Sequence, residues 1–171
     1  MADKMPRKYF HQLVTGVSFG LTTAVITSLG MIVGMYSATS SRLAVVAGIV
    51  VMAVADGLSD AISLHTAEEA EVEKGKGKHT PKELWLTTLF AFVAVSGFTL
   101  TFTVPILLFP ADTAIAVAVG WGFLLLTFLN FYIGKIRNEN PVKIIFEHIL
   151  LAVFVIIISY VVGSLIALGF G

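Results

Sequence analysis

The sequence "AVVAGIVVMAVADGLSDAISLHTAEEAE", residues 44–71, decides the fold of this chain. It starts as an apolar run long enough to cross a bilayer, carries Asp56 and Asp60 one helical turn apart, and then runs into a group of glutamates. No proline interrupts it, and Gly75 is the first residue expected to end a helix. We therefore predict a single helix of about 30 residues, about 45 Å long, that crosses the membrane and projects into the cytoplasm.

The composition of the whole chain is that of a membrane protein. Of its 171 residues, 57% are hydrophobic and 13% are charged, and the mean hydropathy is +0.92. A soluble domain needs more polar surface to cover its core, so we predict an integral membrane protein whose partner is the lipid bilayer and not nucleic acid. The sequence has no cysteine, which excludes disulfides and thiolate metal sites. It also has no Walker A, HExxH, GxSxG or GxGxxG pattern, so we do not expect an enzyme or a permanently bound cofactor.

Five apolar runs are long enough to span a bilayer, which takes about 20 residues. They cover residues 13–36, 43–64, 84–109, 113–133 and 144–169. Ten of the eleven Lys and Arg residues fall in the N-terminal tail or in the two segments 65–83 and 134–143, while Arg42 falls on the other side. The positive-inside rule then places the N-terminus and both segments in the cytoplasm. The predicted fold is all-α, a single transmembrane domain over residues 1–171 with five transmembrane helices, in a multi-pass protein of the cell membrane.

Oxygen ligands follow one side of the extended second helix. At 100° per residue, one stripe holds Asp56, Asp60, Ser63, Ala67 and Glu71, with Glu68 beside it, whereas His65 points the opposite way. Carboxylates inside a membrane are rare enough that a functional site is the default hypothesis, and carboxylates bind divalent cations or carry protons. We therefore predict a cation path along this stripe. The alternative is a solvated surface for the glutamates, and for Asp60 a position at the membrane interface.

Two further polar residues lie near the start of the fifth span. Glu147 and His148 are expected at about the depth of Asp60. They either complete a metal or proton site with Asp60, or Glu147 only stabilises the N-terminus of its own helix. The second interpretation rests on the favourable placement of Glu147 near a helix N-terminus. Asn130 on the fourth span is expected to form a hydrogen bond between helices.

The first span carries a stripe of small residues. Gly16, Gly20, Gly30 and Gly34 fall on one face of this helix and give two GxxxG spacings in register. Small residues let a second helix approach closely, and that helix is either internal or the first helix of a second subunit. We predict a homodimer through these four glycines.

These segments resemble the vacuolar iron transporter family. The resemblance rests on five spans, on the glycine-rich first span "GVSFGLTTAVITSLGMIVGM" (residues 16–35), and on the acidic extension of the second span with its "EEAE" (residues 68–71). It implies a homodimer that moves Fe(II) or Mn(II) out of the cytosol in exchange for protons, along a path between the two first helices. The chain departs from the family pattern at Phe19, where the family has an acidic residue, and in its short connection between spans two and three.

The leading hypothesis is a proton-coupled transporter of divalent transition metals, Fe(II) or Mn(II), as substrates. Its predicted metal ligands are Asp56, Asp60, Glu68, Glu71, Glu147 and His148. The alternative is a membrane scaffold or assembly protein that keeps the fold without the ion path, which the missing acid at Phe19 favours. An intramembrane enzyme acting on lipid is a third candidate that no motif supports.

Overall fold

The computed structural model of the chain describes residues 7–71 and 80–170. They form the helices α1 (Arg7–Thr39), α2 (Arg42–Glu71), α3 (Pro81–Thr101), α4 (Thr103–Leu108), α5 (Ala111–Arg137) and α6 (Pro141–Phe170). Five segments are long and apolar enough to span a membrane, namely Tyr9–Thr39, Arg42–Ala70, Pro81–Leu108, Thr113–Ile136 and Pro141–Phe170. The all-helical prediction and the number of spans are confirmed, and the five helices indicate a multi-pass protein in a lipid bilayer.

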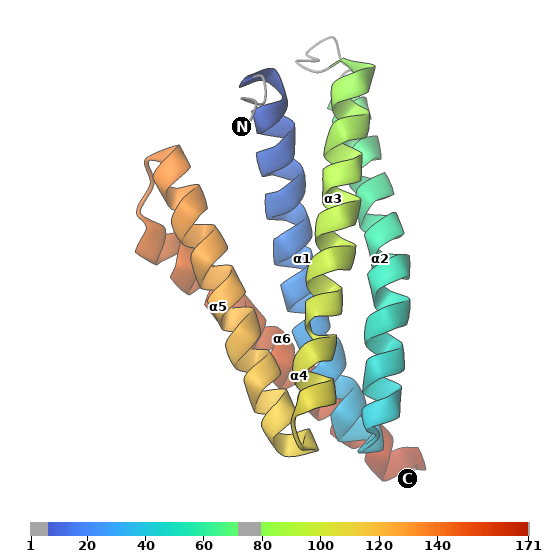
Figure 1. Cartoon of the computed structure of the whole chain (residues 1–171). Coiled ribbons are helices and arrows are strands. Elements are labelled where there is room, and N and C mark those ends of the chain that lie inside the picture. The colour runs from blue at the N-terminus through green and yellow to red at the C-terminus, as the bar shows by residue number, and fades with distance from the viewer. Residues whose placement is uncertain (1–6, 72–79, 171) are drawn as a thin grey trace.

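Helix α1 is the centre of the bundle (Figure 1). Helices α2 and α3 pack together on one side of it, and α5 and α6 form an antiparallel pair on the other side. The start of α1, the end of α2 and the α5–α6 connection lie at one end of the bundle, which we call the inner end because the sequence predicts it to be cytoplasmic. The opposite end is called the outer end. The core around α1 consists of fully buried apolar side chains, such as Val25, Leu29, Ile32 and Leu126.

The glycine stripe of α1 is occupied by helices of the same chain, which corrects the predicted dimer interface. A Cβ atom on Gly16 would lie 2.7 Å from the carbonyl oxygen of Thr87 on α3, and Gly20 faces α3 in the same way. A Cβ atom on Gly30 would lie 2.8 Å from Val155 on α6, and Gly34 also faces α6. Helix α3 therefore covers the inner half of the stripe and α6 the outer half, so the stripe is not free for a second subunit.

The second span is one continuous helix, as predicted. It runs from Arg42 to Glu71 without interruption, and Gly57 lets it pack closely on α3. The predicted end of this helix at Gly75 lies outside the described residues.

The third span differs from the prediction because it is broken near its outer end. Helix α3 stops at Thr101, and α4 resumes at Thr103 for one and a half turns. Pro105 is the cause, since a proline has no N–H to donate to the carbonyl of Thr101 and its ring crowds that carbonyl. Phe102 at the break is fully buried and belongs to the apolar core.

Local capping explains where the helices at the inner end begin and end. The backbone N–H of Thr80 donates to Oε2 of Glu83 at 2.7 Å, which fixes the start of α3 at Pro81. Helix α5 ends at Arg137, the following residue Asn138 has a left-handed φ of 54°, and α6 begins at Pro141. The tight connection brings α5 and α6 side by side as an antiparallel pair.

Candidate functional site

Asp56 and Asp60 lie at the edge of the packed face of α2. Both are half-buried, and each directly precedes a buried small residue, Gly57 or Ala61. Oδ2 of Asp60 is hidden from solvent and has no hydrogen-bond partner among the residues that the structure describes. A carboxylate oxygen in this position is costly unless a proton or a cation binds it. Asp60 is therefore the strongest functional candidate on α2.

The rest of the predicted stripe is more exposed. Ser63 and Ala67 are exposed on α2, and Glu68 is half-buried. Glu71 is the last described residue of the helix, and its side chain lies outside the described part of the chain. Within the stripe, the two aspartates are thus less exposed than Ser63 and Ala67.

His65 is a packing residue between α2 and α3. Its Nδ1 lies 2.9 Å from the hydroxyl of Thr88, and its ring lies 4.5 Å from the ring of Trp85. Because the Thr88 hydroxyl donates to the carbonyl of Leu84, it accepts from His65. The prediction that His65 faces away from the carboxylate stripe agrees with this contact.

Glu147 and His148 do not join Asp60 within one chain. Both residues are on α6, which packs against α1 and α5, whereas α2 lies on the other side of α1. No group of three or more His, Asp and Glu side chains that could hold a metal occurs in the described part of the chain. The prediction of a shared site with Asp60 is therefore wrong for a single chain, because α1 separates the two places.

A cavity of about 700 Å³ lies between α1, α5 and α6 toward the inner end. We call it the inner cavity. Its polar lining consists of His11, Thr15, Ser18, Thr22 and Thr23 of α1, Asn130 of α5 and His148 of α6. Its apolar lining consists of Val14, Phe19, Ile133, Ile136 and Ile144. The cavity therefore has a largely apolar lining with several polar side chains set into it, between helices that are apolar enough to span a membrane.

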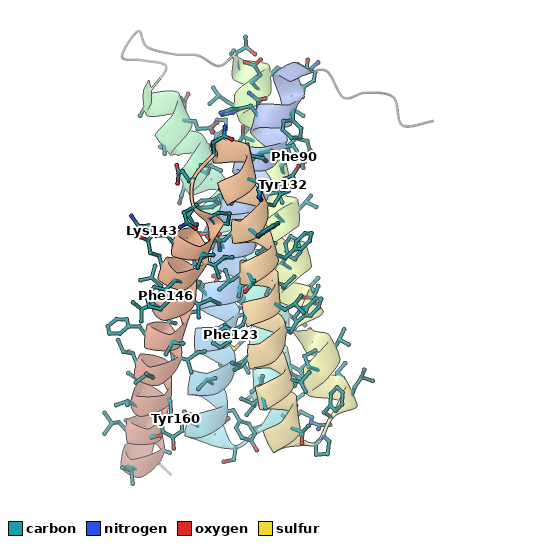
Figure 2. The ribbon with its side chains drawn as sticks, turned by 90° about the vertical axis from the view of Figure 1, so that its left-hand side faces the viewer. Phe90, Phe123, Tyr132, Lys143, Phe146 and Tyr160 are labelled. Carbon is teal, nitrogen blue, oxygen red and sulfur yellow. The ribbon has the colours of Figure 1, made fainter. Side chains whose placement is uncertain are left out.

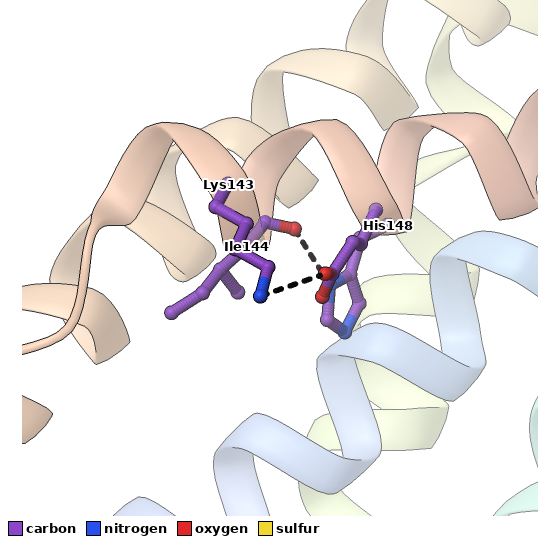
Figure 3. A network of polar contacts seen from close by, with 4 residues as sticks. Lys143, Ile144 and His148 are labelled. Carbon is purple, nitrogen blue, oxygen red and sulfur yellow. Dashed lines mark hydrogen bonds and ion pairs between the residues drawn. The ribbon is translucent and has the colours of Figure 1, made fainter.

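His148 presents an unprotonated ring nitrogen at the cavity. Its Nδ1 lies 2.9 Å from the carbonyl oxygen of Ile144, and since a carbonyl can only accept, Nδ1 carries the hydrogen. In the neutral ring Nε2 then has the free lone pair. Figure 3 shows the ring projecting from α6 toward α1. A histidine whose other N–H is held by a backbone carbonyl is the usual arrangement of a metal ligand.

Glu147 points to a different environment from its neighbour. Oε1 of Glu147 lies 3.9 Å from Nζ of Lys143, one turn earlier (Figure 3). Both side chains are largely exposed. An exposed ion pair of this kind contributes little to stability, and it does not line the cavity. The two predicted candidates on α6 therefore separate, with His148 in the cavity and Glu147 outside it.

Asn130 is fully buried and also lines the inner cavity. Its Nδ2 donates to the carbonyl of Leu126 at 2.8 Å, within α5. The predicted hydrogen bond between helices is therefore wrong, because the amide is used by its own helix. Asn130 still contributes a polar side chain to the lining of the cavity.

The α1 residues of the cavity are the part that the sequence analysis missed. His11, Thr15, Ser18 and Thr22 recur at helical spacing and place polar side chains on one side of this span. That periodicity was available in the sequence, next to the more conspicuous glycine stripe. Phe19 shares this face of the helix, so the position where the resembled family has an acid does line the cavity.

The five long apolar helices indicate a multi-pass membrane protein, and a cavity with several polar side chains lies between three of them. No family model matches the chain, and no solved structure matches it. The chain is 25% identical over 142 residues to an uncharacterized protein of Methanocaldococcus jannaschii, MJ0645, with 72% of this chain and 74% of that protein covered. That relative is itself uncharacterized, so the functional argument rests on the residues.

Proposed function

We propose that this protein is a transporter of divalent transition-metal cations, of the Fe(II) or Mn(II) kind, and that it exports them from the cytosol across the cell membrane in exchange for protons. The observation that carries the proposal is His148, whose Nδ1–H is held by the carbonyl of Ile144 and whose side chain lines the inner cavity. The resemblance of the first two spans to the vacuolar iron transporter family supports the same function.

The ligands around the cavity suit a borderline cation. Imidazole nitrogens are good ligands for Fe(II), and carbonyl and hydroxyl oxygens suit Mn(II). His148 and His11 supply the nitrogens, and Asn130 with the hydroxyls of Ser18 and Thr22 supplies oxygens. In the proposal the cation enters here, and several weak ligands hold it loosely enough to let it leave.

Asp56 and Asp60 have a separate role in the proposal, as proton carriers on α2. Their place on the far side of α1 keeps them from ligating an ion held by His148. The hidden Oδ2 of Asp60 fits alternate protonation and deprotonation during the transport cycle. Because the cavity is formed by three helices of one chain, this route does not need a second subunit.

The test is metal flux into liposomes that contain the purified full-length chain. Mn(II) and Fe(II) are applied with and without a pH gradient, and an enclosed metal-sensitive dye reports their entry. We expect His148→Ala to lower flux by at least about tenfold, since even the loss of a residue that only orients a ligand costs about 10–100-fold. Glu147→Ala is the matched control on the same turn and should keep its flux. Absence of flux in the unmodified protein, or equal flux in the two variants, would overturn the proposal.

The second candidate function is a membrane scaffold. Phe19 in the lining of the inner cavity favours it, because an aromatic ring there offers no oxygen to a cation. A scaffold binds no metal, so calorimetric titration of the purified protein with Mn(II) separates the two candidates.

A further inference from the structure

A second cavity lies along the same three helices, at the outer end. It has a volume of about 320 Å³ and is lined by Val33, Tyr36 and Ser37 of α1, Ser40 beyond it, Ile115 of α5 and Tyr160 of α6. We call it the outer cavity. Figure 2 shows Tyr160 toward the outer end of the face formed by α5 and α6, with Tyr132 toward the inner end and Phe123 at a level between them. Both cavities therefore belong to the interface between α1 and the α5–α6 pair.

A short apolar layer separates the two cavities. On α1 the inner cavity reaches Thr23 and the outer cavity starts at Val33, ten residues later, which is about 15 Å of helix. The side chains in this layer are fully buried, and they include Val25 and Leu29 of α1, Leu126 of α5 and Ala152 of α6. They belong to one apolar cluster. The layer excludes water because packed protein interiors have few voids larger than a water molecule.

Leu29 is a bulky member of the layer and lies opposite Gly122 of α5. A Cβ atom on Gly122 would lie 2.9 Å from Cδ1 of Leu29, so the leucine fits there only because α5 has a glycine opposite it. Ala152 on the α6 side is small as well. Removal of the Leu29 side chain therefore takes away atoms that fill the space between α1 and α5 next to Gly122.

We infer that the substrate path runs within one chain, between α1 and the α5–α6 pair, and that Leu29 closes it between an inner and an outer cavity. The path takes a small hydrated cation, and the structure is the state that is open toward the inner end and closed at Leu29. This inference rests on the proposed transport function. It differs from the path between two copies of the first helix that the family resemblance implies.

The absence of cysteine from the sequence makes a direct test available, because a single introduced cysteine is the only thiol in the protein. Single cysteines are placed by Thr22→Cys in the inner cavity, Ser37→Cys in the outer cavity and Glu139→Cys on the exposed α5–α6 connection. A charged, membrane-impermeant thiol reagent is then applied from each side of sealed vesicles. The side that labels Glu139→Cys identifies the inner face. The control is Ser28→Cys, because Ser28 lies on α1 between the cavities and is fully buried.

The expected result is that Thr22→Cys reacts from the inner face and Ser37→Cys from the outer face, each faster than Ser28→Cys. In a Leu29→Ala background, Thr22→Cys should also react from the outer face, at least about tenfold faster than before, since the packed layer no longer excludes water. Leu126→Ala is a second variant of the layer in case Leu29→Ala does not fold. If Thr22→Cys reacts no faster than Ser28→Cys, or neither layer variant changes the reactive side, the inference is overturned. Labelling needs no metal, so its outcome is independent of the flux measurement that tests the proposed function.

Discussion

Nδ1 of His148 lies 2.9 Å from the carbonyl oxygen of Ile144, one turn earlier on α6. Because this contact uses the N–H of the ring, Nε2 is the nitrogen that remains to accept a proton or bind a cation. The backbone of α6 thus sets the chemistry that the side chain presents to the inner cavity. Glu147, the neighbouring residue, lies at the surface near Lys143, so consecutive residues of α6 face the cavity and the exterior.

The first prediction concerns the hydrogen on the His148 ring. In nitrogen-15 NMR spectra of the protein in detergent micelles at a pH where the ring is neutral, His148 should show the Nδ1–H tautomer. Addition of Mn(II), which is paramagnetic, should broaden the ring signals of His148 at substoichiometric concentration. His65 is an internal control, because it has the same tautomer but lies between α2 and α3. An Nε2–H tautomer at His148, or equal broadening of both histidines, would contradict the assignment.

The second prediction is that Asp60→Ala stabilises the protein and removes proton coupling. The substitution eliminates a hidden oxygen that has no hydrogen bond among the described residues, and because Asp60 as a whole is half-buried, the free energy of unfolding should rise by about 1 kcal/mol, the low end of the usual range. Flux of Mn(II) should then no longer respond to a pH gradient. Thermal unfolding in detergent and vesicle flux measure the two effects.

The control for this variant is Ser59→Ala, an exposed neighbour on α2. It should change neither the unfolding temperature nor the response to pH. Lower stability of Asp60→Ala together with intact coupling would show that the carboxylate has a structural role instead.

The third prediction concerns Asp56, one turn deeper in the same helix. Asp56→Asn keeps the shape of the side chain but cannot carry a proton, so metal-dependent transport in reconstituted vesicles should be abolished while the folded protein is retained. Ser63→Ala on the exposed part of the same side should transport normally. Unchanged flux in Asp56→Asn would exclude the residue from the transport cycle.

Much of the fold is predictable from this sequence because long apolar runs have few alternatives in a bilayer. The five spans, the extended second helix and the starts of α3 and α6 at Pro81 and Pro141 follow from hydropathy and helix-capping rules. The break at Phe102 is also predictable, since Pro105 disfavours a continuous helix there. A hydropathy count does not detect it, because Pro105 lies within an apolar run.

The candidate site is less predictable because it depends on which helices meet. A helical projection orders the residues of one helix but does not say that α1 separates Asp60 from His148. The same limitation applies to the glycines of α1, since a stripe of small residues fits an internal helix as well as a second subunit. The cavity could not be foreseen from any single span, because three helices contribute to it.

The last prediction tests whether the small residues between α1 and α6 hold the bundle together. A Cβ atom on Gly163 would collide with Ser37 and with the backbone carbonyl of Gly34, and backbone atoms of a packed helix cannot move aside cheaply. Gly163→Ala should therefore lower the free energy of unfolding by about 1–3 kcal/mol, as overpacking usually does. Gly169→Ala is the matched control on the same helix, because nothing lies within 4 Å of the added atom. It should be neutral or stabilising by up to about 1 kcal/mol, the difference in helix propensity. If Gly163→Ala instead leaves the stability of the single chain unchanged and dissociates an oligomer, the close contact of α1 and α6 within one chain is wrong and the stripe serves a second subunit.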